Sequence, residues 1–186
     1  MTSKVRKLLY VFLACMPLVW PWPVTKEETP SNISRWNEKG KELASQGDFP
    51  KALEAFNKAL EIDPQNCVTW NNKGVTFGLK KDYNRAYEAF STAIRYGCDN
   101  DAAIWCNRGL ALHNLGRFDE ALASYERALI IKPDFTAAWH NKGELFLVQK
   151  RCEEALNAYR EALMIEPDYP PAKEGVAKAK KCLESS

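Results

Sequence analysis

Apolar residues recur three and four positions apart through most of this chain, in segments that are separated by glycine, proline or aspartate. This spacing places the apolar side chains on one face of a helix. The pattern predicts a chain of short helices without strands. The expected helices cover residues 33–46, 49–62, 67–80, 83–96, 102–115, 118–131, 136–149 and 152–165, with a ninth after Pro170-Pro171.

The same landmark residues return in register along the chain. Tryptophan recurs at intervals of 34, 35 and 34 residues, and a glycine follows each tryptophan by four. The small and aromatic residues of the following segment keep that period, and Cys98 stands where proline closes the other repeats. The landmarks are Trp36, Trp70, Trp105 and Trp139; Gly40, Gly74, Gly109 and Gly143; Ala52, Ala86, Ala121 and Ala155; Phe56, Phe90, Tyr125 and Tyr159; Ala59, Ala93, Ala128 and Ala162; Pro64, Pro133 and Pro167.

Each landmark has a physical role in a pair of packed helices. The glycine removes a side chain, so that a second helix can approach closely, and the alanines are the matching small residues on that helix. The aromatic residue fills the space between helices, and the proline ends each repeat because it cannot continue a helix. Each hairpin buries too little surface alone, so the hairpins are expected to stack.

This pattern resembles the tetratricopeptide repeat (TPR) family over residues 33–169. The resemblance implies an all-α, right-handed α-solenoid of four TPR hairpins with a C-terminal capping helix. We expect a hydrophobic leader at 1–24, a linker at 25–32, repeats at 33–66, 67–101, 102–135 and 136–169, and the cap at 170–186. One extra residue near 99–101 predicts a changed angle between the second and third repeats.

The first 24 residues differ from the rest. A basic start is followed by an uncharged run, Leu8–Val24, that prolines interrupt. A spanning helix needs about 20 apolar residues, so the run favours an export signal or a short membrane anchor. Cys15 could carry a lipid if Phe12–Cys15 is a lipoprotein box, and the run could instead dock on the protein. Membrane association or export is expected through 1–24, with a cytoplasmic location as the alternative.

Composition limits the function classes. With 26 basic and 24 acidic residues, the net charge is only +2, which is too small a positive charge to indicate nucleic-acid binding. The six cysteines show no metal-binding spacing, and five lie beyond the leader, which argues against a complete set of disulfides. Cys152 replaces an aromatic residue, so we expect a buried free thiol and a reducing setting, which conflicts with export. No catalytic motif is present, so we expect no enzyme, no cofactor and no small-molecule substrate.

The TPR resemblance implies that the first helix of each hairpin lines a concave groove for a protein or peptide partner. Two positions after tryptophan the chain has Asn72, Asn107 and Asn141, an asparagine ladder whose amides can pair with the backbone of an extended peptide. These asparagines could equally be the common residue of the repeat. The expected groove residues are Asn37, Lys41, Asn72, Val75, Leu79, Asn107, Leu110, His113, His140, Asn141, Glu144 and Leu147.

Two more specific sites could occupy the same groove. A carboxylate clamp, as in chaperone-tail binders, needs cations in the third repeat, where this chain has Ala103 and Asn107, so we do not expect one. Cys106, His113 and His140 share the groove and offer zinc-type ligands. No metal motif supports them, so contact with a partner is the expected role and no metal is expected. A membrane-tethered assembly or co-chaperone-like factor is the alternative function.

Overall fold

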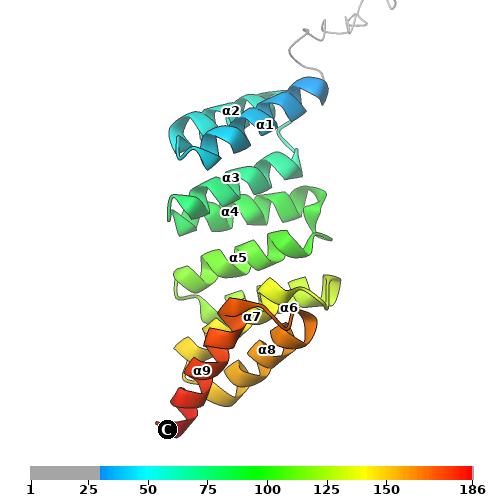
Figure 1. Ribbon diagram of the computed structural model, residues 1–186. Helices are drawn as coiled ribbons and strands as arrows, with labels where there is room; N and C mark the ends of the chain where they lie inside the picture. The colour runs from blue at the N-terminus through cyan, green and yellow to red at the C-terminus, as the bar shows by residue number, and fades with distance from the viewer. Residues whose placement is uncertain (1–29, 186) are drawn as a thin grey trace, which may run out of the picture.

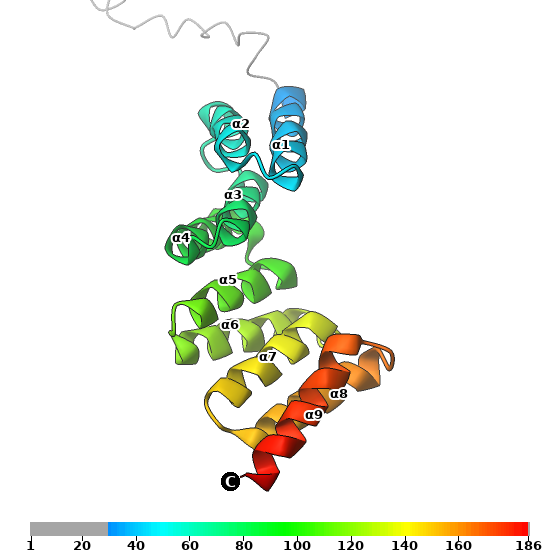
Figure 2. The same cartoon turned by 60° about the vertical axis from the view of Figure 1, so that its left-hand side comes forward.

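The computed structural model describes residues 30–185, which form a right-handed stack of helical hairpins. Figure 1 shows the hairpins in chain order from α1–α2 at one end to α8–α9 at the other. First helices contact the first helices of adjacent hairpins, and Figure 2 shows α9 lying against α7 and α8. The helices are α1 (Pro30–Ser45), α2 (Phe49–Ile62), α3 (Cys67–Leu79), α4 (Tyr83–Ala93), α5 (Ala102–Asn114), α6 (Phe118–Ile131), α7 (Thr136–Val148), α8 (Cys152–Ile165) and α9 (Pro170–Glu184).

The turns inside the hairpins follow the expected capping chemistry. The carboxylate of Asp48 accepts the backbone N–H of Lys51 and caps α2, and Asp82 caps α4 in the same way. Two residues after the first helix of each hairpin ends, the backbone is left-handed, a conformation that glycine adopts easily. Gly47 and Gly116 hold this position in repeats one and three, whereas lysines hold it in repeats two and four. Their φ angles are 81° and 74° for the glycines, and 61° and 58° for Lys81 and Lys150.

Each landmark glycine makes room for the aromatic ring of its own hairpin. A Cβ added at Gly74 would lie 2.6 Å from Cε1 of Phe90, and one at Gly109 would lie 2.6 Å from Cε1 of Tyr125. These distances are far below carbon contact at about 3.5–4.0 Å. The rings are fully or almost fully buried with the alanines around them. The predicted close approach of the two helices is therefore confirmed.

The tryptophans are less buried than their regular recurrence along the chain suggested. The Trp105 ring is only partly buried, and its indole N–H donates to the backbone oxygen of Asp99 (2.8 Å). Trp70 and Trp139 bind the backbone oxygens of Pro64 and Pro133 in the same way. Each of these indoles therefore fixes the turn between its repeat and the preceding one, while the buried core belongs to the aromatic residues of the second helices.

The extra residue between repeats two and three is accommodated at the end of α4. The turn Ile94–Cys98 follows that helix, and its backbone leaves the helical region at Tyr96 and at Gly97, whose φ is 103°. The insertion is therefore confined to this turn, and the side-by-side packing of α4 and α5 is retained.

Two disulfides correct the expectation for the cysteines. Cys152 is bonded to Cys182 and Cys67 to Cys98, so Cys152 is not a free thiol. The sequence argument failed because each partner lies about one repeat away, a separation that no local motif reveals. Among the described cysteines, Cys106 is the free one, and it is buried.

The two ends of the chain differ in detail from the expectation. Helix α1 begins at Pro30, so the last residues of the expected 25–32 linker are helical. In α9, Ala172, Gly175 and Ala179 are buried and Val176 is partly buried, whereas Leu183 is exposed. The expected leader, 1–24, lies outside the described residues. Among the helices of residues 30–185, none has the length and apolar character that crossing a membrane requires.

Candidate peptide-binding groove

Three connected pockets run along the first helices of the hairpins. The first lies between α1 and α3, the second between α3 and α5, and the third is bounded by α5, α7 and α9. Adjacent pockets share lining residues: Val75 and Leu79 join the first two, and Leu110 and Asn114 join the last two. The pockets therefore form one groove, and ten of the twelve expected site residues line it. These are Lys41, Asn72, Val75, Leu79, Asn107, Leu110, His113, His140, Asn141 and Glu144.

The central pocket, between α3 and α5, is apolar and has a volume of about 310 Å³. Leu79 and Leu110 are 56% and 42% exposed on its walls, although leucine side chains are usually buried. Tyr83 and Phe90 of α4 contribute to the same pocket. Its size and lining suit a bulky apolar side chain.

The third pocket is polar, and the carboxylate of Glu144 lies at its centre. The Tyr159 hydroxyl donates to Glu144 Oε1 (2.6 Å), and the amine of Lys178 lies 3.8 Å from the same oxygen. His140 Nε2 lies 3.9 Å from it. Helix α9 adds Pro171, Glu174 and Lys178 to this wall. Burial raises the pKa of Tyr159, and the Glu144 carboxylate raises it further, so the hydroxyl stays protonated and keeps donating.

The asparagine ladder is partly occupied by contacts between repeats. The amide of Asn72 donates to Oδ1 of Asn37 (3.1 Å), and that of Asn141 donates to the Cys106 sulfur (3.4 Å). Both bonds join adjacent first helices. Asn107 lines the central pocket and has no hydrogen bond to its side chain from any described residue. Of the three asparagines, Asn107 is thus the one whose amide faces the groove unpaired within residues 30–185.

Two expected groove residues belong to the packing instead. Asn37 is 7% exposed, and its amide donates to the Thr69 hydroxyl (2.8 Å) while its oxygen accepts Asn72. The Asn37 side chain lies in the joint between hairpins and connects repeats one and two. Leu147 is partly buried against the core of repeats three and four. Neither residue lines the three pockets.

Cys106, His113 and His140 have separate surroundings in the structure. Within residues 30–185, no group of three or more His, Cys, Asp or Glu side chains is arranged to hold a metal ion. Burial raises the pKa of the Cys106 thiol to about 11, with a smaller opposite effect of the Asn141 hydrogen bond. Burial also lowers the pKa of His113, against a weaker pull from Glu144. The thiol and the imidazole therefore stay uncharged at neutral pH.

Sequence reasoning missed the contributions of the second helices and of α9. Phe90 is a landmark of the repeat core, yet it lines the groove as well, and so does Tyr83 at the start of α4. The predicted capping helix forms the end wall of the groove in addition to covering the core. The sequence held one clue to the role of α9, because Gly175 follows Gly143 by about one repeat. In the structure, both glycines pack on the Tyr159 ring.

Helical hairpins stacked in one direction, with a groove along the first helices, define an α-solenoid repeat protein. Models of the tetratricopeptide repeat match residues 34–66 and 102–135, residues 55–88, and residues 136–169. The chain belongs to the tetratricopeptide repeat family. This repeat is typically a non-enzymatic scaffold for protein–protein interaction.

Solved structures agree on the fold. The MamA protein is similar with a TM-score of 0.74 and 21% identity, covering 85% of this chain and 84% of MamA. PilF from Pseudomonas aeruginosa has the same TM-score and identity, covering 82% of this chain and 69% of its own. The first TPR domain of Spaghetti (RPAP3), bound to the HSP90 peptide SRMEEVD, has a TM-score of 0.61 and 21% identity, covering 66% and 96%. Among curated proteins, none matches the chain by sequence.

Proposed function

We propose that this chain is a non-catalytic interaction module that binds an extended segment of a partner protein in its groove. The apolar central pocket carries the proposal. It exposes Leu79 and Leu110 on adjacent first helices, where burial of the exposed part of each would contribute about 1 kcal/mol. A bulky apolar residue of the partner would fill this pocket. The polar third pocket would receive the adjacent part of the segment.

The unpaired amide of Asn107 supports an extended partner backbone. It lines the central pocket beside Leu110, where one carboxamide can both donate to and accept from a peptide group. Asn107→Ala should weaken binding by about 1 kcal/mol, roughly fivefold, without lowering stability. Asn72→Ala should lower stability as well, because the Asn72 amide also joins repeats one and two.

The test begins with a random peptide library that is selected against the full chain. The best peptide is then titrated calorimetrically against the wild type, Leu79→Asp and Leu110→Asp. A matched control is Ile130→Asp, since Ile130 of α6 is 69% exposed and lies outside the three pockets. We expect the groove variants to lose at least about tenfold in affinity, as for a buried apolar anchor. Equal affinity of all four folded proteins would exclude the groove.

A carboxylate-terminated peptide is a useful second probe. The RPAP3 domain was solved with the peptide SRMEEVD. In this chain Asn37 is buried, Ala103 is not cationic and Lys41 is already paired with Glu38 (2.6 Å). We therefore expect SRMEEVD to bind much more weakly than the selected peptide. Tight binding of this peptide would show that the groove does recognise terminal carboxylates.

We also propose that residues 1–24 export the module or hold it at a membrane, which would make it a tethered assembly factor. The basic start and the uncharged Leu8–Val24 run support this proposal. The full chain should fractionate with membranes or outside the cytoplasm, and a variant that starts at Ser31 should be soluble. The same location for both chains would rule out a role of the leader.

A further inference from the structure

Four of the five described cysteines lie in pairs. The Cα atoms are 5.7 Å apart in Cys67–Cys98 and 5.8 Å apart in Cys152–Cys182. Both separations are close to the value that disulfides favour, about 5.5–6 Å. The backbone of the solenoid therefore presents both pairs at bonding distance, although the partners are 31 and 30 residues apart in sequence.

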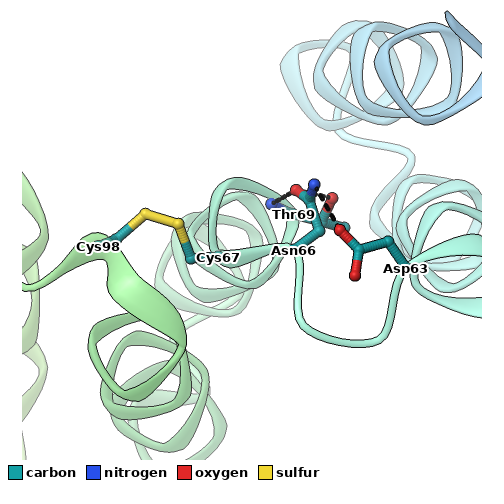
Figure 3. The surroundings of a disulfide bond; sticks show 5 residues. All are labelled: Asp63, Asn66, Cys67, Thr69 and Cys98. Carbon is teal, nitrogen blue, oxygen red and sulfur yellow. Dashed lines mark hydrogen bonds between the residues drawn. A yellow bond between two sulfur atoms is a disulfide. The ribbon is translucent and has the colours of Figure 1, made fainter. Parts of the chain in front are cut away.

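Each bond joins the first residue of one helix to the far end of the antiparallel segment that packs beside it. Cys67 is the first residue of α3, and Cys98 ends the turn after α4, so the bond closes the open end of that hairpin. Figure 3 shows this bond next to Asn66, the residue that caps α3. Cys152 is likewise the first residue of α8, and Cys182 lies in the last turn of α9. One device is thus used twice, at the open ends of α3–α4 and α8–α9.

Two of these cysteines also replace the residue that the repeat uses elsewhere. Cys98 stands where the other repeats have proline, and Cys152 stands where they have Phe49, Tyr83 or Phe118. Each replacement is bonded to a cysteine outside the landmark positions. The departures from the repeat pattern are therefore accounted for by the bonds.

We infer that this chain works in an oxidising compartment, where disulfides close the α3–α4 and α8–α9 hairpins. In each pair the two thiols give up two protons and two electrons to a thiol–disulfide oxidoreductase or to glutathione disulfide. Such bonds form and persist outside the cytosol, because the cytosol keeps thiols reduced. The partner of the groove must then be found in that compartment, a consequence that rests on the proposed function.

The fifth thiol is protected from exchange with these bonds. Cys106 is 4% exposed and accepts the Asn141 amide. Burial raises the pKa of its thiol to about 11, so almost no thiolate, the form that attacks disulfides, is present at neutral pH. The free cysteine therefore does not scramble the two pairs.

The second disulfide secures a weakly packed wall of the groove. Helix α9 docks through Ala172, Gly175 and Ala179, which bury little apolar area. Among the described helices, α9 packs against α8 and α7. The Cys152–Cys182 bond holds it against α8, and with it Glu174 and Lys178 in the polar pocket.

The first test traps thiols in the cells that make the protein. Cells are quenched with acid, and the denatured full chain is alkylated with N-ethylmaleimide, digested without reductant and analysed by mass spectrometry. We expect linked peptides for 67–98 and 152–182, and among the described cysteines alkylation at Cys106 alone. Alkylation of the other four in most molecules, or different pairings, would overturn the inference.

The second test measures amide hydrogen exchange in the full chain without ligand. Cys182→Ser should speed exchange in α9 by about a hundredfold and leave α3 and α4 unchanged. Cys98→Ser is the matched control and should do the reverse. Unchanged exchange in α9 would show that the bond does not secure this wall. Because no ligand is present, failure of the groove proposal would not affect either outcome.

Discussion

Two glycines of α3 allow the stability effect of close helix packing to be measured apart from the effect of helix propensity. A Cβ added at Gly74 would lie 2.6 Å from the Phe90 ring, whereas one added at Gly78 would have nothing within 4 Å. Both positions are helical and lie one turn apart. Replacement by alanine brings about the same gain in helix propensity at each, roughly 0.8–1 kcal/mol. The propensity contribution therefore cancels when the two variants are compared.

What remains is the overpacking at Gly74. The Phe90 ring is 3% exposed, so it has little room to move by the ångström that the new methyl group requires. Overpacking of this kind costs about 1–3 kcal/mol. Gly78→Ala should therefore be more stable than the wild type by up to about 1 kcal/mol. Gly74→Ala should be less stable than Gly78→Ala by about 1–3 kcal/mol.

Urea denaturation followed by circular dichroism measures this difference, and melting temperatures should differ by about 2–4 °C for each kcal/mol in a chain of this size. Hydrogen exchange should show the loss in α3 and α4 first. Gly74→Ala combined with Phe90→Leu should recover part of the stability, because the smaller side chain vacates the space. Equal stability of the two single variants would refute the packing role of Gly74.

Other measurements address single features of the structure. Lys81→Gly and Lys150→Gly should each raise the free energy of unfolding by about 0.5–1 kcal/mol, because glycine tolerates the left-handed backbone, and Gly116→Ala should lower it by about 1 kcal/mol in urea titrations. The folded-state pKa of His113 lies below its usual value of about 6.5, so the unfolded chain takes up the proton first. Unfolding free energy should therefore fall as pH drops from about 7 to 5.5, and His113→Asn should flatten that change. Trp105→Phe removes the N–H that binds Asp99 and should cost about 1 kcal/mol by thermal melts.

The sequence predicted the helices because local and repeated signals agree. Spacing, caps and landmark residues all point to the same hairpins, and every expected helix within residues 33–165 lies within a few residues of its observed bounds. The Gly–aromatic packing was also predictable, because its partners occupy fixed positions within one hairpin. Such consistency across levels is what makes a fold readable from sequence.

The site was predicted less completely, and the reasons are physical. Position one after tryptophan is exposed or buried according to the twist between hairpins, so Asn37 could not be assigned from spacing alone. The cysteine pairs join residues that only the three-dimensional stack brings together. The groove wall formed by α9 depends on how the last helix crosses α7, which its composition does not encode.

The ring of Tyr159 is enclosed by a glycine on either side, Gly143 of α7 and Gly175 of α9. Helix α9 thus packs on this ring in the way that the first helix of a hairpin does. Its outward surface exposes Lys173, Lys180 and Lys181. Another hairpin, or the end of a second molecule, would have to bury these charges in order to stack there. The exposed charges of α9 therefore disfavour end-to-end stacking of molecules on this surface.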